Sequence, residues 1–216
     1  MVAAATHDPG AARAEPSSSD GDYGRLDDDT HVAVEVGASV AVGADDDPGV
    51  SLAARVSWFY LRTVGLVAGY DESFDRDTQP LRRSFSGALE VRPLFLGRFA
   101  SDLERGPAWA DLTLDSLALS FGGWAGLPRD RSCPPRTCPI DSGIAAGLGL
   151  DLPLQPRANR LFVGLDARVL WTVDGARHRE GASSLRVPPA FMLTLTLGYQ
   201  HGWALGLVDA GDAVPP

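Results

Sequence analysis

The chain has 216 residues, a hydrophobic content of 44% and a formal net charge of −9 at pH 7. The length suits one domain with a tail, and the negative charge argues against a nucleic-acid partner, because phosphates attract Lys and Arg patches. No stretch approaches the roughly 18–20 continuous apolar residues of a spanning helix, so a helical membrane protein is excluded. A membrane protein built from strands needs no such run, because only one side of each strand faces lipid.

The first 30 residues are rich in Ala, Ser, Asp, Gly and Pro and lack an apolar period, so residues 1–30 are predicted to be a disordered arm. The character changes after that. In Val32–Val42, every even position is Val or Ala, and Glu35, Gly37 and Ser39 lie between them. This period of two is typical of a strand with unlike faces. We expect a domain over residues 31–203 and a short tail over residues 204–216.

The same alternation returns along the chain. It predicts seven further strands, at about Val50–Leu61, Val64–Asp71, Ser84–Leu96, Ala110–Trp124, Gly143–Leu154, Arg160–Val173 and Ala190–Trp203. In the fifth strand the apolar phase changes, which predicts a β-bulge near Asp115–Ser116. Strands of about 9–13 residues match those that cross a bilayer at a tilt, and an even number closes an antiparallel sheet. The predicted fold is all-β: a closed, antiparallel, up-and-down barrel of about eight strands, of the membrane type.

The second face of the strands is mostly Gly, Ser, Thr and Ala, which suits the crowded interior of a narrow barrel. The charged residues predicted to point inward are Glu35, Arg55, Glu90, Arg92, Asp115, Asp151, Asp166 and Arg168. Unpaired charge in a narrow lumen costs several kcal/mol, so opposite charges are expected to pair. A structural plug of ion pairs is the favoured interpretation, and a polar lumen that gates small ions is the alternative.

Aromatic residues cluster near the predicted strand ends, and Val, Leu, Ile and Ala fill the outward mid-strand positions. One predicted rim carries Trp58, Tyr60, Phe95, Trp109 and Trp203. The other carries Tyr70, Phe85, Phe121, Trp171 and Phe191. Two aromatic girdles around an aliphatic band are typical of a barrel that crosses a lipid bilayer.

Over about Val32–Trp203 the chain resembles the small eight-stranded barrels of the outer-membrane protein A type. The last strand, LTLTLGYQHGW, is similar to the C-terminal insertion signal of that group, although His201 stands where an apolar residue is usual. The resemblance implies the outer membrane of a Gram-negative bacterium, recognition by the outer-membrane assembly machinery, and periplasmic termini. The implied outer loops are Asp45–Gly49, Glu72–Leu81, Leu127–Ser142 and Asp174–Pro188. The implied inner turns are Arg62–Thr63, Gly97–Pro107 and Gln155–Asn159.

Export requires a signal peptide, and Met1–Gly24 lacks the charged start and apolar core of such a segment. Three explanations stay open: a mis-assigned start, a leader missing from this sequence, or a location outside the outer membrane. An in-frame leader in the DNA upstream of Met1 would decide between them.

Function is predicted less sharply than fold. We expect a monomeric outer-membrane barrel with a filled lumen, no cofactor, no metal and no catalytic residues, acting in a structural or surface-interaction role through its outer loops. A lipid-modifying barrel enzyme is the first alternative, since His178, Glu180 and Ser183 or Ser184 have the residue types of a Ser–His–acid site. A soluble ligand-binding barrel is the second. Asp45–Asp47 indicate an acidic hairpin loop rather than a calcium site, because their spacing is not that of an EF-hand.

Cys133 and Cys138 are predicted to form a disulfide in the third outer loop. Two prolines lie between them and restrict the backbone, which favours the approach of the α-carbons to within about 7 Å. So short a loop removes little chain entropy, so the bond should shape the loop and leave the melting temperature unchanged on reduction. Intact-mass analysis after thiol alkylation, with and without reductant, measures this; full alkylation of the non-reduced protein would refute the disulfide.

Overall fold

The computed structural model describes residues 28–42, 49–73, 81–100, 107–128, 140–157, 159–173, 190–203 and 205. These residues form eight strands and two short helices. The elements are β1 (Thr30–Val42), β2 (Gly49–Tyr60), β3 (Val64–Ser73), β4 (Leu81–Val91), α1 (Pro93–Ala100), α2 (Ala108–Asp115), β5 (Ala118–Pro128), β6 (Asp141–Pro153), β7 (Arg160–Thr172) and β8 (Ala190–Trp203). Neither helix within these residues is long and apolar enough to cross a membrane.

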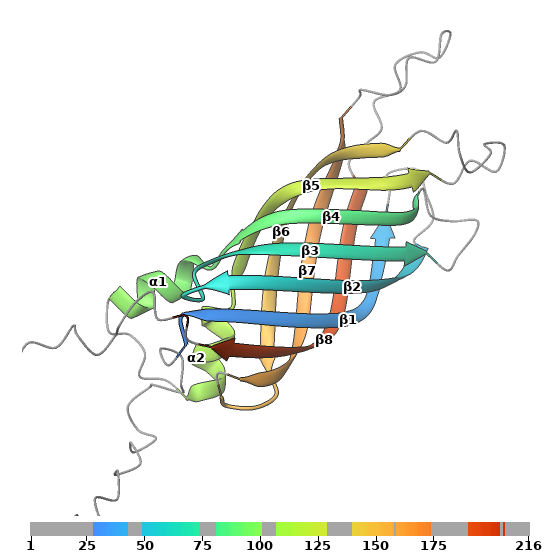
Figure 1. The fold of residues 1–216 in the computed structure, drawn as a ribbon. Coiled ribbons are helices and arrows are strands. Elements are labelled where there is room, and N and C mark those ends of the chain that lie inside the picture. Colours follow the sequence, from blue (N-terminus) through green and yellow to red (C-terminus); the bar gives the residue numbers. More distant parts are fainter. Residues whose placement is uncertain are drawn as a thin grey trace, which may run out of the picture.

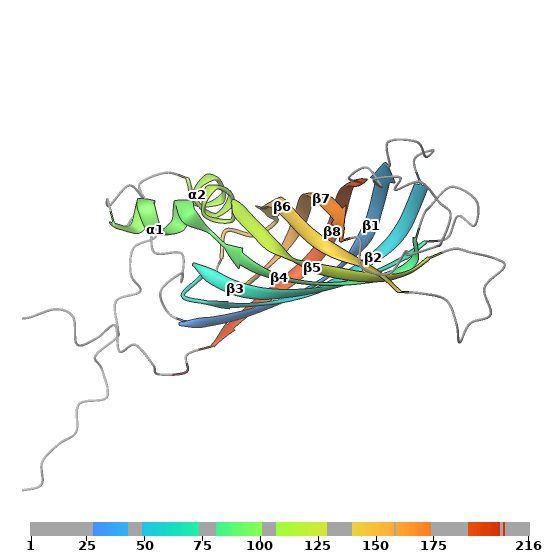
Figure 2. The ribbon, with the colours of Figure 1, turned by 90° about the horizontal axis from the view of Figure 1, so that it is seen from above.

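The strands form one closed barrel in chain order, and each pairs antiparallel with its neighbours (Figure 1). β1 closes the sheet against β8, with Thr30 opposite Trp203 and Val42 opposite Phe191. The predicted closed antiparallel barrel of eight strands is therefore confirmed. The barrel has a terminal end, where β1 begins and β8 ends, and a loop end opposite to it. Figures 1 and 2 place both helices at the terminal end.

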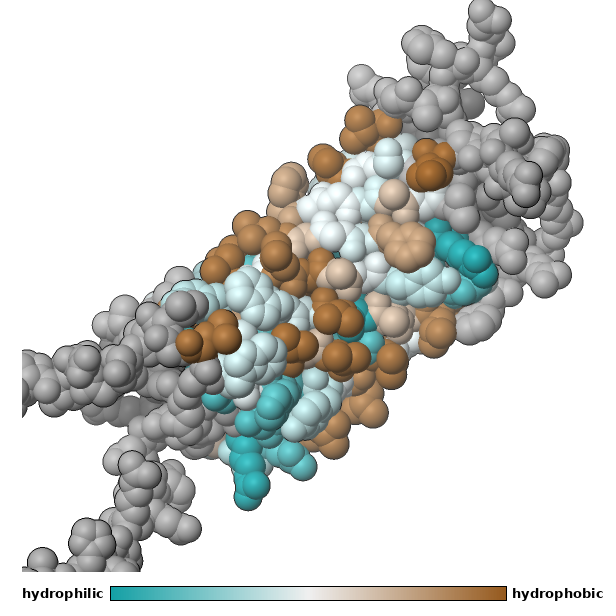
Figure 3. All heavy atoms as spheres, viewed as in Figure 1, coloured by the Kyte–Doolittle hydropathy of each residue, from teal (hydrophilic) through white to brown (hydrophobic). Residues whose placement is uncertain are grey.

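Burial alternates along the strands with the period of two seen in the sequence. In β8, the inward Met192, Thr194 and Thr196 are buried, and the outward Leu193 and Leu195 are exposed. The outward residues of adjacent strands form continuous apolar rows through the pairing. One such row is Leu165, Leu195, Ala38 and Leu52, on β7, β8, β1 and β2. Figure 3 shows apolar and weakly polar residues over most of the visible strand surface.

Two predicted strands were wrong in extent. β4 ends at Val91 and the chain enters α1 at Pro93, so the strand predicted to reach Leu96 is shorter. The segment predicted as the start of the fifth strand is α2, and β5 begins only at Ala118. The apolar phase change is real, but a helix causes it and not a β-bulge. The inner turn predicted at Gly97–Pro107 is correspondingly part of a longer helical insertion between β4 and β5.

Close packing between strands explains at least one glycine. A Cβ atom on Gly37 would overlap the backbone carbonyl oxygen of Leu195 and lie 2.7 Å from the Cα of Thr196. Both atoms belong to β8, the strand that closes the barrel, and backbone atoms of a sheet cannot move aside at low cost. A Cβ on Gly87 meets no atom within 4 Å.

We predict that Gly37→Ala destabilises the barrel by about 1–3 kcal/mol, as overpacking does in tight cores. Gly87→Ala, the matched control, should leave stability unchanged or slightly raised. Denaturant unfolding of both variants in detergent micelles measures the difference. Equal stabilities would contradict the β1–β8 packing described here.

Candidate functional site

The candidate site is the charged interior of the barrel, hereafter the lumen cluster: Glu35, Arg55, Glu90, Arg92, Asp151, Asp166 and Arg168. Each member lies within or directly after a strand. Alternation turns them inward, and all except the half-buried Asp151 are buried. Three of the ion pairs among them join different strands, Arg55 with Glu90, Arg55 with Asp166 and Arg92 with Asp151, and so link segments that are far apart in the sequence.

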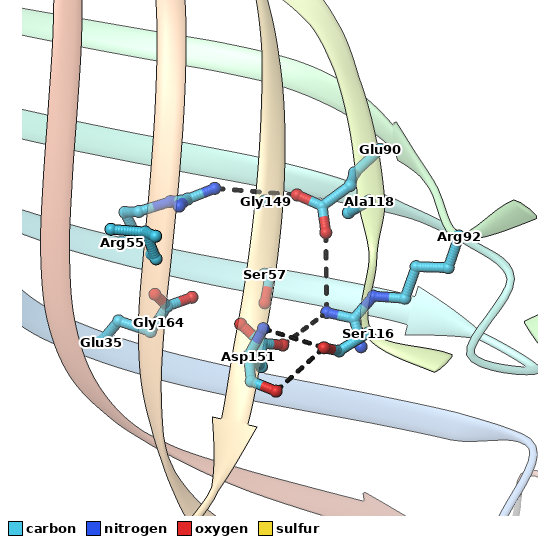
Figure 4. Close-up of a pocket in the computed structure, with 11 residues that line it drawn as sticks. Glu35, Arg55, Ser57, Glu90, Arg92, Ser116, Ala118, Gly149, Asp151 and Gly164 are labelled. Carbon is cyan, nitrogen blue, oxygen red and sulfur yellow. Dashed lines mark hydrogen bonds and ion pairs between the residues drawn. The ribbon is translucent and has the colours of Figure 1, made fainter. Parts of the chain in front are cut away.

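Arg55 of β2 forms two ion pairs of the lumen cluster, and Figure 4 shows its guanidinium directed toward Glu90. Its guanidinium is 3.7 Å from a carboxylate oxygen of Glu90 on β4 and 3.4 Å from one of Asp166 on β7. Since β2 and β7 are not neighbours in the barrel, the second pair crosses the lumen. Asp166 also pairs with Arg168, two residues further along the same strand.

Arg92 closes the lumen cluster toward the terminal end. Its Nη2 lies 3.5 Å from Glu90 and donates at 3.1 Å to Asp151 Oδ2 on β6, the second strand along from β4. The guanidinium carbon also lies 4.0 Å from the centroid of the Phe59 ring, a cation–π contact. Figure 4 shows Glu90 between Arg55 and Arg92, so one carboxylate joins the two cations.

Several polar residues that the sequence analysis did not single out complete this interior. Ser39 donates to Asp71 at 2.8 Å and lies 3.1 Å from the Thr194 hydroxyl. Thr196 donates to Glu35 at 2.7 Å. The alternation of inward and outward residues along each strand already places these positions inside the barrel. The pattern that predicts an inward Glu35 therefore predicts the same for all of them.

A second polar group lies nearer the terminal end. The Arg62 Nε donates to the Nε2 of His31 at 3.0 Å, and both side chains are buried, as are Arg160 and Gln200. Arg62 and the preceding Leu61 have φ of 54° and 46°, a left-handed turn that costs energy in residues other than Gly. The backbone bond from Leu61 N to Asp29 O, at 2.7 Å, helps to hold this turn.

Asp115 was wrongly predicted to point into the lumen. It is the last residue of α2 and pairs with Arg98 of α1, at 2.9 Å. Arg98 also pairs with Asp111. The error follows from the strand prediction for this segment, because alternation cannot describe a helix.

The structure separates the predicted aromatic residues into two groups. Phe95 is buried in α1 and Trp109 is exposed on α2, so neither lies on a strand of the barrel wall. The other eight lie on strands at outward positions: Trp58, Tyr60, Tyr70, Phe85, Phe121, Trp171, Phe191 and Trp203. Phe121 is the fourth residue of β5 counted from the terminal end and lies opposite Leu89 of β4, so its predicted placement at the loop-end rim is wrong.

The lumen cluster leaves little free volume. Two cavities among these side chains each measure about 10 Å³, which is about what one water molecule needs. The first is bounded by Glu35, Arg55, Glu90 and Arg92, and the second by Arg55 and Arg168. Among the described residues, no group of three or more His, Cys, Asp or Glu side chains is arranged to hold a metal ion.

Four predictions lie wholly or mostly outside the described residues: the Cys133–Cys138 disulfide, the His178, Glu180, Ser183 and Ser184 site, the acidic loop Asp45–Asp47, and the arm over residues 1–30, of which residues 1–27 are not described. The tail is outside as well, except for Leu205. These stay predictions.

No protein-family model matches the chain, and no curated protein matches it. Among solved structures, the chain is similar to the N-terminal β-barrel domain of Pseudomonas aeruginosa OprF, with 12% identity, a TM-score of 0.43, and 79% of this chain and 97% of that chain covered. It is also similar to Ail of Yersinia pestis, with 11% identity, a TM-score of 0.43 and coverage of 80% and 99%. Neisserial surface protein A is similar as well, with 9% identity, a TM-score of 0.43, and 81% of this chain and 97% of that chain covered. The strand order and pairing described above come from the structure of this chain and do not depend on these similarities.

We predict that Arg92→Leu lowers the free energy of unfolding by about 3–5 kcal/mol, because it leaves the buried Glu90 and the half-buried Asp151 with one cation fewer. The control is Arg83→Leu, which removes an exposed ion pair to Glu72 at 3.0 Å and should cost far less, since water screens that pair. Thermal and denaturant unfolding in the same detergent measure both variants. Similar losses would contradict the inward assignment of Arg92.

Proposed function

We propose that this protein is a bacterial outer-membrane barrel that is embedded through its apolar outer face, has a lumen filled by side chains, and acts in a structural or surface-interaction role through its loop end. Both termini would then be periplasmic, and the loop end would be extracellular. We also propose that it inserts as a monomer through the outer-membrane assembly machinery.

The observation that carries the membrane proposal is the inside-out distribution of polarity. Leu195 and Val36 are 57% and 58% exposed at mid-strand, whereas the inward Glu35 and Asp166 are 6% and 2% exposed. A soluble barrel has the opposite arrangement, with charge facing water and apolar groups inside. Contiguous apolar surface around a whole barrel is unfavourable in water and favourable in hydrocarbon.

The proposal of a filled lumen is supported by ion pairs that cross the interior. Arg55 reaches from β2 to β7, and Arg168 of β7 donates to Ser86 of β4 at 3.3 Å. An eight-stranded barrel has an interior just wide enough for its side chains. The role at the loop end is supported only by the general tendency of loops on a rigid scaffold to carry function.

The membrane proposal predicts that the same substitution has unequal effects on stability at two leucines of similar exposure. Leu195→Arg, at the middle of β8, should lower stability in lipid by about 2–4 kcal/mol, the cost of a lipid-facing cation near the bilayer midplane. Leu205→Arg, beyond the end of β8, should have little effect, although Leu205 is 52% exposed, close to the 57% of Leu195. Unfolding in phospholipid vesicles measures both variants. A tolerated Leu195→Arg, together with a wild-type protein that is monodisperse in plain buffer, would refute membrane embedding.

The filled lumen predicts that the refolded wild-type protein gives no large steady conductance in planar lipid bilayers. Detergent buffer carried through the same procedure is the blank, and circular dichroism of the inserted sample verifies the folded barrel. Reproducible steady current steps from folded protein would contradict the filled lumen while leaving the membrane proposal intact.

A further inference from the structure

The helical insertion between β4 and β5 is not needed to close the barrel, since a short turn joins β2 to β3 at the same end. α1 and α2 have eight residues each, and both lie at the terminal end (Figures 1 and 2). Helices this short are marginal in water without tertiary packing. Their position therefore depends on what they contact.

Both ends of the insertion are fixed to the same residue of β6. Arg92, directly before α1, donates to the Asp151 carboxylate at 3.1 Å. Ser116, directly after α2, accepts a hydrogen bond through its hydroxyl from the Asp151 backbone N–H at 2.8 Å. In the register of β5 and β6, Ala118 lies opposite Gly149, so residues 116 and 151 would be the next inward pair of this ladder. The Ser116 hydroxyl takes the place of a backbone acceptor there.

The polar groups of the two helices face each other and the barrel. Asp111 and Asp115 of α2 are 3% and 6% exposed, and both pair with Arg98 of α1. Leu112 and Phe95 are buried beside them. The charged residues of this pair of helices are thus on its inner side.

Two large apolar residues of α2 face outward, although Leu112 is buried. Trp109 is 62% exposed and Leu114 is 48% exposed, and Leu94 of α1 is exposed as well. A surface helix in water normally shows the reverse pattern, with its apolar stripe toward the core and its charges outside. In α2 both acidic residues are buried while Trp109 and Leu114 are exposed, so its exposed side is apolar and carries no charge.

α2 packs against β6, a strand of the barrel wall. At the same end, the outward Leu152 of β6 and Leu154, just beyond the strand, are exposed as well. Trp favours the boundary between headgroups and acyl chains, and amphipathic segments bury an apolar face about 5–10 Å into that boundary. The packing of α2 against a strand with an apolar outer face favours lipid over a protein as the occupant.

We propose that Leu94, Trp109 and Leu114 bind the headgroup–acyl boundary of the periplasmic leaflet. The two helices would then contact the membrane surface beside β6, and these three residues are called the foot below. The proposal rests on the proposed membrane embedding of the barrel. It adds a phospholipid contact that the strands do not make.

Fluorescence quenching at single labelled cysteines tests the foot and the embedding separately. In a variant with Cys133 and Cys138 replaced by Ser, an environment-sensitive fluorophore is attached at Leu114→Cys, with Leu94→Cys as a second reporter on the foot. Leu148→Cys, outward on β6, reports the barrel wall, and Gln155→Cys, exposed in the turn after β6, reports water. The proteins are refolded into phosphatidylcholine–phosphatidylglycerol vesicles with iodide on both sides, or with nitroxide lipids labelled near the headgroup.

The expected result is strong quenching of Leu114→Cys and Leu94→Cys by the nitroxide lipids and several-fold weaker quenching by iodide than at Gln155→Cys. Lipid quenching at Leu148→Cys with iodide quenching at both foot positions would overturn the foot and leave the embedding intact. Shielding of the foot from both quenchers would also overturn it, since a protein surface would then cover it. Absence of lipid quenching at Leu148→Cys would refute the embedding itself. Circular dichroism of each labelled protein verifies the folded barrel.

Discussion

Backbone hydrogen bonding is the constraint on which the rest of this structure depends. A sheet in hydrocarbon has no water to satisfy a free edge, so it must close on itself, and here β1 closes against β8. Closure creates an inner and an outer face, and the two-residue period of a strand assigns each side chain to one of them. The Val and Leu positions then fall outside, and Glu35, Arg55 and Asp166 fall inside. Because the interior is narrow and little solvated, the charges placed there must pair with one another.

The ion pairs of the lumen have a structural consequence beyond neutralisation. Arg55 links β2 to β4 and β7, and Arg92 links the β4 end of the barrel to Asp151 on β6. Because Arg92 also precedes α1, the same residue fixes the lumen and the helical insertion. Loss of this one side chain should therefore affect the barrel interior and the seating of the helices together.

Most of the fold could be predicted from the sequence because alternation is a local signal. It located all eight strands and the inward direction of residues such as Glu35 and Arg168. It failed for α2, where an eight-residue helix with Leu112 and Leu114 also satisfies a period of two, so the pattern predicts a strand there and places Asp115 in the lumen. Pairing in the lumen could not be predicted either. Which carboxylate meets Arg55 depends on the stagger of strands around the closed barrel, and no single strand encodes that stagger.

Accessibility of spin labels along one strand tests the central claim most directly. Single labels at consecutive positions from residue 161 to residue 171 of β7, in lipid vesicles, report contact with oxygen dissolved in lipid and with a water-soluble nickel complex. The account predicts high oxygen accessibility at Leu161, Leu165 and Trp171 and low accessibility to both reagents at the buried positions between them, such as Phe162 and Asp166. High accessibility of the outward positions to the nickel complex, with no preference for oxygen, would show that this face meets water and would contradict the account.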